Sequence, residues 1–332
     1  MGQSKRIFLT GAAGYIGSRL AVRLIEHGHE VVGLDREKAP EGVGFADYIQ
    51  ADLLEPEAYS DILASCPTIF HLAAAKGDWG ISDEEYGRDN VEATDALIAA
   101  ASDANVEDWV FYSTVSVLGP SDIALSEEAP HAPANPYGSS KAKGERAFDA
   151  LVKRSPSVRV LTIRPSVVFG PENPWNTNIY RLIDSIARRR FIMIGDGRQI
   201  KTTSFIDNLI DATIHLFDRR ALLPGQDIYH CIDEPTISVA AMVHFIRQRL
   251  NARATAKLPL WLVAPVASVA DLVATLLRID LPITSARIKK FSTATNFSAA
   301  KLQSTGFRPR WSIEDGLSET IAWHEAKRKT AA

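Results

Sequence analysis

The chain is poor in cysteine and has no excess of charge of one sign. Of its 332 residues only two are cysteines, Cys66 and Cys231, and their spacing fits neither a metal site nor a redox pair. We therefore expect a reduced, cytoplasmic protein without a metal, and not a disulfide-stapled scaffold. The formal net charge is only −3, so a nucleic-acid partner is not expected either.

Long apolar runs are also scarce. The most apolar stretch spans residues 258–277, but its uncharged part contains Pro265 and ends at Asp271. This is too short to span a membrane, so we expect a buried or interfacial helix and no transmembrane segment. The N-terminus enters a strand pattern directly, and no signal peptide is expected.

What the sequence does contain is a regular alternation of apolar strands and helices in its first half. Strand patterns cover residues 6–11, 29–35, 68–74, 108–114 and 158–170, and helical patterns cover residues 16–28, 90–104 and 137–152. A helical pattern at 207–219 and a strand pattern at 227–232 return to the sheet later in the chain. Continuous apolar strands separated by helices are typical of a parallel sheet covered on both faces. The predicted fold class is α/β, a Rossmann-type doubly wound sheet.

After residue 170 the pattern loosens into loops that contain proline and glycine. We expect a smaller, discontinuous substrate-binding domain made of residues 171–204 and 235–332. Residues 1–170 and 205–234 would form the domain that contains the sheet.

A glycine loop lies between the first strand and the first helix. The stretch TGAAGYIGSRL places Gly11, Gly14 and Gly17 there, and glycine lets the backbone approach a pyrophosphate at a helix N-terminus. Asp35 ends the second strand, where a carboxylate accepts hydrogen bonds from a ribose diol and repels a 2′-phosphate. NAD is therefore favoured over NADP, although the neighbouring Arg36 partly offsets that repulsion.

The stretch YGSSK places Tyr137 and Lys141 one helical turn apart. Thr114 ends an earlier strand, and the carboxyl edge of an open α/β sheet is where ligands bind. A tyrosine is a poor base at neutral pH, and a lysine ammonium nearby is expected to lower its pKa. A threonine hydroxyl can hold a substrate oxygen in line, so these three residues predict proton and hydride transfer at one carbon.

With these motifs the chain resembles an extended short-chain dehydrogenase/reductase of the NAD-dependent sugar-nucleotide epimerase/dehydratase type. The resemblance runs from about residue 5 to 325. It rests on TGAAGYIG, GLD, ADL, HLAAAK, NVEAT, STVSVLG, YGSSK, IRPSVVFGP, GDGRQIKTTSFIDN and STGFRPRWSIEDGL, in that order.

The resemblance implies a set of site residues. The catalytic set would be Tyr137, Lys141 and Thr114. Contacts to NAD would come from Gly11, Gly14, Tyr15, Ile16, Gly17, Asp35, Arg36, Asp52, Leu53, Leu72, Ala73, Ala74, Lys76, Asn90, Tyr137, Lys141, Pro165 and Val168. The substrate would be held by Thr114, Asn178, Phe191, Lys201 and Arg287. Two readings of Asn90 stay open, a structural cap or part of a polar network, whereas His71 is expected to pack at a strand end.

Some positions depart from the family pattern. Leu118 stands where many members have tyrosine, and Lys201, Thr202 and Asn208 also differ from the usual residues. A lysine still neutralises a phosphate but does not make the bidentate contact of an arginine. These departures weaken the assignment of a particular nucleotide sugar.

The residues after Thr114 bear on the reaction. Family dehydratases place an acidic pair there, but here Val115 and Ser116 follow. The leading hypothesis is therefore a nucleotide-sugar epimerase acting at C4 of a UDP-sugar. Two alternatives remain, an NAD(P)-dependent dehydrogenase or reductase of an apolar alcohol such as a 3β-hydroxysteroid, and a non-catalytic cofactor-binding regulator. The resemblance also implies a homodimer formed through the helices at 91–104 and 138–153.

Overall fold

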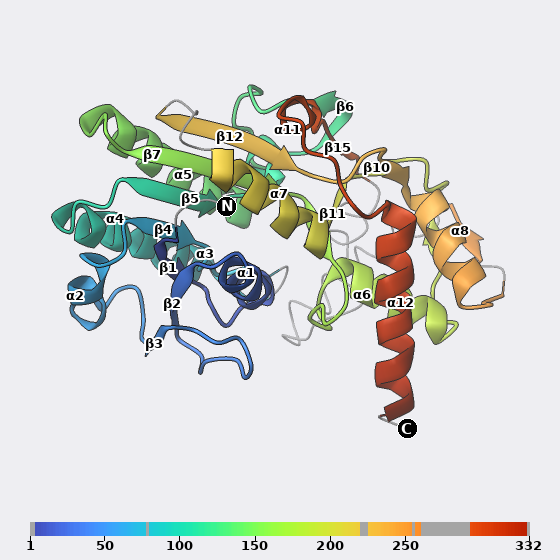
Figure 1. The fold of residues 1–332 in the computed structure, drawn as a ribbon. Helices are drawn as coiled ribbons and strands as arrows, with labels where there is room; N and C mark the ends of the chain where they lie inside the picture. The colour runs from blue at the N-terminus through green and yellow to red at the C-terminus, as the bar shows by residue number, and fades with distance from the viewer. Residues whose placement is uncertain (1–3, 78–79, 220–224, 254–255, 260–292, 331–332) are drawn as a thin grey trace.

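The computed structural model describes residues 4–77, 80–219, 225–253, 256–259 and 293–330, and its largest element is a seven-stranded sheet (Figure 1). In sheet order the strands are β12 (Gln226–Cys231), β7 (Arg159–Pro165), β5 (Asp108–Tyr112), β4 (Thr68–His71), β1 (Arg6–Thr10), β2 (Glu30–Asp35) and β3 (Asp47–Gln50). Every pairing in this sheet is parallel. The predicted α/β class with a Rossmann-type sheet is confirmed.

Helices cover both faces of the sheet because its strands are apolar on both sides. The helices that do so are α1 (Tyr15–Glu26), α4 (Ala93–Asp103), α5 (Pro136–Arg154) and α7 (Ile206–Arg219). α1 and α7 pack together, and Leu20 and Leu209 share one apolar cluster. α4 and α5 pack together, and Leu97 and Phe148 share a second cluster with Phe8 of β1. Two cores on opposite faces define a doubly wound sheet.

The strand order reverses beside β1, which fixes the expected place of a ligand. β2 and β3 lie on one side of β1, and β4, β5, β7 and β12 lie on the other. Because the strands are parallel, Thr10, Asp35, His71, Tyr112 and Pro165 all lie at the same edge of the sheet. Ligands of open α/β sheets bind outside this carboxyl edge, at the reversal.

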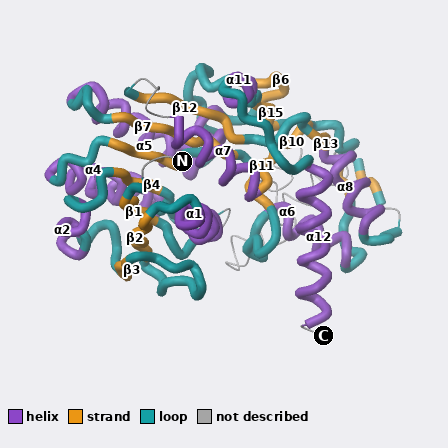
Figure 2. The backbone as a smooth tube through the Cα atoms, in the orientation of Figure 1, coloured by secondary structure: helices purple, strands orange, loops and turns teal. Residues whose placement is uncertain are grey.

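The other described residues add small sheets and a group of three packed helices. One sheet has the order β13 (Ile237–Ser238), β10 (Ile200–Lys201), β15 (Thr295–Phe297) and β6 (Ser121–Leu125), and two pairs are β11 (Thr203–Phe205) with β8 (Val167–Phe169) and β14 (Lys257–Leu258) with β9 (Met193–Ile194). The packed helices are α6 (Asn178–Ala187), α8 (Val239–Arg249) and α12 (Ile313–Thr330), seen together at one end of the molecule in Figure 2. β6 falls within residues 1–170 yet pairs with β15, so the expected division into two domains stays a prediction.

The helix expected over residues 90–104 has an irregular start. A π-helical segment, η2 (Gly87–Glu92), precedes α4. The remaining short elements are η1 (Pro56–Ala58), α2 (Ser60–Leu63), α3 (Asp83–Tyr86), η3 (Val115–Leu118) and α11 (Ala300–Ser304). π-turns inside helices are often found at functional sites.

Most of the apolar stretch 258–277 lies outside the described residues, so the expectation of a buried or interfacial helix there is untested. Among the residues that are described, none of the helices combines the length and the apolar character needed to cross a bilayer.

Candidate active site

The loop between β1 and α1 brings backbone very close to backbone. Gly11 has a φ of +71°, and a Cβ at this position would lie 2.7 Å from the backbone nitrogen of Ala73. A Cβ on Gly17 would lie 2.0 Å from the carbonyl oxygen of Gly11. Gly14 is the N-cap of α1 and carries no side chain to cap the first N–H groups of the helix. These groups and the positive end of the helix dipole fit the pyrophosphate of a dinucleotide such as NAD.

Asp35 is fixed beside this loop at the end of β2. Its Oδ2 accepts the N–H of Ala13 at 3.0 Å, and its Oδ1 accepts the N–H of Glu37 at 3.1 Å. The carboxylate is therefore anchored at the place where the predicted ribose diol would lie.

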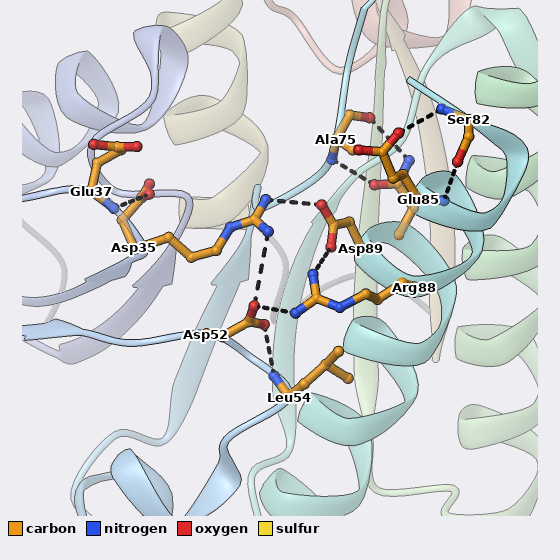
Figure 3. A network of polar contacts seen from close by, with 11 residues as sticks. Asp35, Glu37, Asp52, Leu54, Ala75, Ser82, Glu85, Arg88 and Asp89 are labelled. Atoms are coloured by element: carbon orange, nitrogen blue, oxygen red, sulfur yellow. Dashed lines mark hydrogen bonds and ion pairs between the residues drawn. The ribbon is translucent and has the colours of Figure 1, made fainter. Parts of the chain in front are cut away.

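Four charged side chains form a ring next to Asp35, which Figure 3 shows from close by. We define the rim ring as Arg36, Asp52, Arg88 and Asp89, joined by ion pairs between 2.5 and 3.8 Å. Burial acts to raise the pKa of Asp52, but the N–H of Leu54 and the Arg88 guanidinium outweigh it and lower that pKa. Arg88 and Asp89 were not predicted as site residues. The sequence carries little signal for them, because Asp52 lies 36 residues before Arg88.

A polar network joins the loop after β4 to α5, which holds the predicted tyrosine and lysine. The N–H of Ala73 donates to Thr10 Oγ1 at 3.2 Å. The side chain of Asn90 accepts the N–H of Ala75 at 2.6 Å and donates to Ser140 Oγ at 2.9 Å. Of the two open readings of Asn90, the structure supports the polar network. The same loop carries Leu72, Ala74 and Lys76.

His71 is a buried structural residue, as expected. Its ring nitrogens lie 2.8 Å from Thr10 Oγ1 and 2.9 Å from Thr94 Oγ1. Burial, helped by the nearby charge of Lys141, lowers the pKa of His71 to about 3. The imidazole is therefore neutral and fully hydrogen-bonded.

The start of α5, which carries Tyr137, packs against η3, the short helix that begins after Thr114. Asn135 caps the helix by accepting the N–H of Gly138 at 2.7 Å. A Cβ on Gly138 would lie 2.5 Å from the carbonyl oxygen of Ser116, so the contact needs glycine. Thr114 is the N-cap of η3 and accepts the N–H of Ser116 at 3.2 Å.

Burial shifts the two titratable groups of YGSSK in opposite directions. It raises the pKa of Tyr137, and Tyr86 adds to this rise. It lowers the pKa of Lys141 to about 7, while the charge of Glu145 opposes the shift. The sequence-based expectation was that Lys141 lowers the pKa of Tyr137, and the structure differs because burial, which disfavours the charged phenolate, raises that pKa. The Lys141 Nζ lies 4.3 Å from the centre of the Phe111 ring.

A buried cluster of charged and polar side chains surrounds Glu145 in the middle of α5. Glu145 lies one turn after Lys141 and is 2% exposed, and Arg164 Nη2 donates to its Oε2 at 2.6 Å. Ser113 donates to the same carboxylate, and His131 Nε2 lies 2.8 Å from it. Burial alone would raise the pKa of Glu145, but hydrogen bonds from Arg164 and His131 lower it to about 2. These residues were missed, although the spacing from Lys141 to Glu145 is one helical turn and was visible in the sequence.

Five further predicted cofactor residues are packed into the fold near the ends of these strands. Pro165 ends β7, and Val168 is buried in β8. Tyr15 begins α1 and donates its O–H to the carbonyl of Pro171 at 3.0 Å, while Ile16 packs against the apolar core. Leu53, which directly follows Asp52 in the chain, is buried.

The predicted substrate residues come from separate elements of the C-terminal part. Asn178 begins α6 and is exposed, and Phe191 is partly buried after that helix. Lys201 lies in β10 and donates to the carbonyl of Thr293. Arg287 lies outside the described residues. That these residues converge on one substrate stays a prediction.

The chain is similar in sequence to several known proteins. A family model described as "NAD dependent epimerase/dehydratase family" matches residues 7–231, which is more than half of the chain. An N-acetyl-alpha-D-glucosaminyl-diphospho-ditrans,octacis-undecaprenol 4-epimerase of Escherichia coli O157:H7 is 29% identical over 96% of this chain and 94% of its own. A 2-alkyl-3-oxoalkanoate reductase of Stenotrophomonas maltophilia is 31% identical over 66% of this chain and 67% of its own.

A solved structure resembles the whole chain. MoeE5 in complex with UDP-glucuronic acid and NAD is 27% identical, with a TM-score of 0.76 over 97% of this chain and 99% of its own. The same protein has also been solved with UDP-glucose and NAD.

Proposed function

Because the chain belongs to the NAD-dependent epimerase/dehydratase family and its cofactor is NAD, we propose that it is a UDP-sugar 4-epimerase. The observation that carries this proposal is the local sequence and geometry at the end of β5. Thr114, Tyr137 and Lys141 lie on adjoining elements, and η3 follows Thr114 with Val115 and Ser116 instead of an acidic pair. This arrangement supports reversible oxidation of one carbinol, without elimination.

In the proposed reaction Tyr137 removes the proton of the sugar 4-hydroxyl, and Thr114 donates a hydrogen bond that holds the same oxygen. Bound NAD supplies the hydride acceptor and then the hydride donor. Tyr137 returns the proton after the keto-sugar has turned over. Since burial raises the pKa of Tyr137, the charged form of Lys141 is needed to favour the phenolate.

The substrate is proposed to be a sugar diphosphate held between the two parts of the chain. Asn178, Phe191, Lys201 and Arg287 are the proposed contacts to its nucleotide and diphosphate. MoeE5 binds two UDP-sugars, which supports UDP as the carrier. The Escherichia coli relative is named for a sugar attached to a polyprenyl diphosphate. A lipid-linked sugar is therefore the substrate to test beside the UDP-sugars.

A second candidate function is net reduction or oxidation of an apolar alcohol. It is favoured by the Stenotrophomonas maltophilia reductase, and by the apolar stretch at residues 258–277. The two functions differ in their use of the cofactor. An epimerase regenerates NAD in each turnover, whereas a reductase or dehydrogenase consumes one cofactor for each product.

The test is turnover without added cofactor. The full-length protein is purified, its retained nucleotide is identified, and UDP-glucose, UDP-glucuronic acid or a polyprenyl-diphosphate sugar is supplied. We expect a 4-epimer to form with no net change in NADH, and Tyr137→Phe to slow turnover by about 10²- to 10⁴-fold. Tyr229→Phe, in β12, is the matched control and should retain turnover. A parallel assay supplies NAD or NADH with an apolar alcohol or ketone. Stoichiometric formation or use of NADH there, with none of the sugars converted, would replace the epimerase with the second candidate.

We also propose that the protein is a cytoplasmic homodimer in which α4 and α5 pair with their copies. The support is that these two helices pack side by side on one face of the sheet. The division into residues 1–170 with 205–234 and residues 171–204 with 235–332 is likewise proposed. Light scattering tests the dimer, and a mass of one chain, 36.4 kDa, would contradict it.

A further inference from the structure

The rim ring alternates positive and negative charge around four residues. Arg36 Nη2 donates to Asp89 at 2.9 Å, and Arg36 Nη1 lies 3.8 Å from Asp52. Arg88 Nη2 donates to Asp52 at 2.7 Å, and Arg88 Nη1 donates to Asp89 at 2.5 Å. Each arginine therefore faces both carboxylates, and the closest carboxylate of Arg36 is Asp89.

The ring comes from three segments that meet at the cofactor edge (Figure 3). Arg36 directly follows Asp35 at the end of β2, Asp52 follows β3, and Arg88 and Asp89 lie in the π-helical η2. Asp35 itself is anchored to the glycine loop through the N–H of Ala13. The ring thus begins one residue beyond the carboxylate that fits a ribose diol.

An arginine in this position is the side chain that accommodates the 2′-phosphate of NADP. Its guanidinium suits a phosphate because it offers two parallel N–H donors. In this chain, however, both sides of the Arg36 guanidinium are occupied by carboxylates of the ring. A phosphate would have to displace Asp89 and then lie beside two aspartates as well as Asp35.

We propose that Asp89 is a specificity-determining residue for the cofactor, acting by holding Arg36 away from a 2′-phosphate. Asp35 favours the free ribose diol of NAD, and Asp89 denies NADP the cation that would offset the repulsion by Asp35. The two acids act together, one on the ribose and one on the neighbouring arginine. The inference concerns the nucleotide end of the site and does not depend on which sugar is the substrate.

The ring allows Arg36 to be released without releasing Arg88. In Asp89→Asn the closest anionic partner of Arg36 is lost, whereas Arg88 keeps its 2.7 Å contact with Asp52. The variant is also close in size and shape to the original side chain. It isolates the charge of Asp89 from the packing of η2.

The experiment measures the dissociation constants of NAD and NADP by calorimetry with the full-length protein after bound nucleotide has been exchanged out. We expect Asp89→Asn to lower the ratio of the NADP constant to the NAD constant by about tenfold or more, since a charged hydrogen bond is gained. Glu92→Gln is the matched control, because it removes one negative charge from the same segment at an exposed position outside the ring. That control should leave the ratio within about twofold of the parent value.

Two further variants complete the test. Adding Arg36→Gln to Asp89→Asn should abolish the gain, and Arg36→Gln alone should leave the ratio of the unmodified protein nearly unchanged, because Arg36 does not yet serve NADP. The proposal is overturned by an unchanged ratio in Asp89→Asn, by an equal fall in Glu92→Gln, or by a gain that survives the loss of Arg36. If Asp89→Asn does not fold, Arg36→Gln alone still decides, since a marked loss of NADP affinity there would show that Arg36 already serves the phosphate.

Discussion

The buried cluster around Glu145 and the rim ring around Arg36 are both networks of opposite charges, but they differ in their contact with water. The side chains of Glu145 and Arg164 are each 2% exposed, whereas those of Arg36 and Arg88 are 53% and 47% exposed. In the buried cluster no solvent replaces a lost partner, so the ions hold β5, β7 and α5 together as parts of one scaffold. At the rim, water competes for each pair, so the ring contributes little to the stability of the fold. The first network fixes where the chemistry occurs, and the second is suited to selecting what binds.

The largest effect is expected from removing the acid of the buried cluster. Glu145→Ala leaves the Arg164 guanidinium buried without its carboxylate, which should lower the free energy of unfolding by about 3–5 kcal/mol. Asp149→Ala, one turn further along α5, removes an exposed acid paired with Lys153 and should cost less than about 0.5 kcal/mol. Urea unfolding measures both variants. Equal losses of unfolding free energy in the two variants would contradict the larger contribution expected of the buried acid.

A second test concerns pH dependence on the buried side. The pKa of Lys141 is lowered to about 7 from its ordinary value near 10.5. Between these two values the unfolded chain binds more protons than the folded chain, so the lysine makes stability rise with pH across this window. In nucleotide-free protein, the stability of the parent relative to Lys141→Met should therefore increase from pH 7 to about 10.

The control for this measurement is on the same helix. Lys153→Met makes the same chemical change at a side chain that is 74% exposed, and its stability should run parallel to the parent over the same pH range. If the stability difference between the parent and Lys141→Met did not change with pH, the lowered pKa of Lys141 would be contradicted.

The smallest effect is expected at the rim. Arg36→Gln removes two contacts of the ring, but the side chain is half-exposed, and exposed ion pairs contribute less than about 1 kcal/mol. Thermal unfolding without nucleotide should therefore change only slightly. A loss of stability as large as that of Glu145→Ala would show that the rim ring stabilises the fold as much as the buried cluster does.

Much of the fold was predictable because strong local signals agreed with the tertiary structure. The glycine loop, Asp35 and the strands of the first half follow from apolar runs and from glycine spacing, and each lies where the pattern placed it. Asn90 remained ambiguous because its role depends on Ala75 and Ser140, which no spacing rule links to it.

Other features were not accessible from sequence. The rim ring joins residues up to 53 positions apart, so its ion pairs arise only from the fold. The raised pKa of Tyr137 likewise depends on burial, which only the folded structure shows. The strand at Ser121–Leu125 is mostly exposed and short, and its pairing with Thr295–Phe297 has no local signature.

The π-helical turn at Gly87–Glu92 has a consequence for changes of chain length. Three consecutive residues serve different ends of the cofactor site: Arg88 and Asp89 face the rim, and Asn90 reaches the loop after β4 and α5. Each residue of an α-helix advances the side-chain direction by about 100°. Deleting a single residue from this turn would rotate its side chains relative to α4, so that the rim and Asn90 could no longer both keep their contacts. The number of residues in the turn, and not only their identity, thus constrains the sequence.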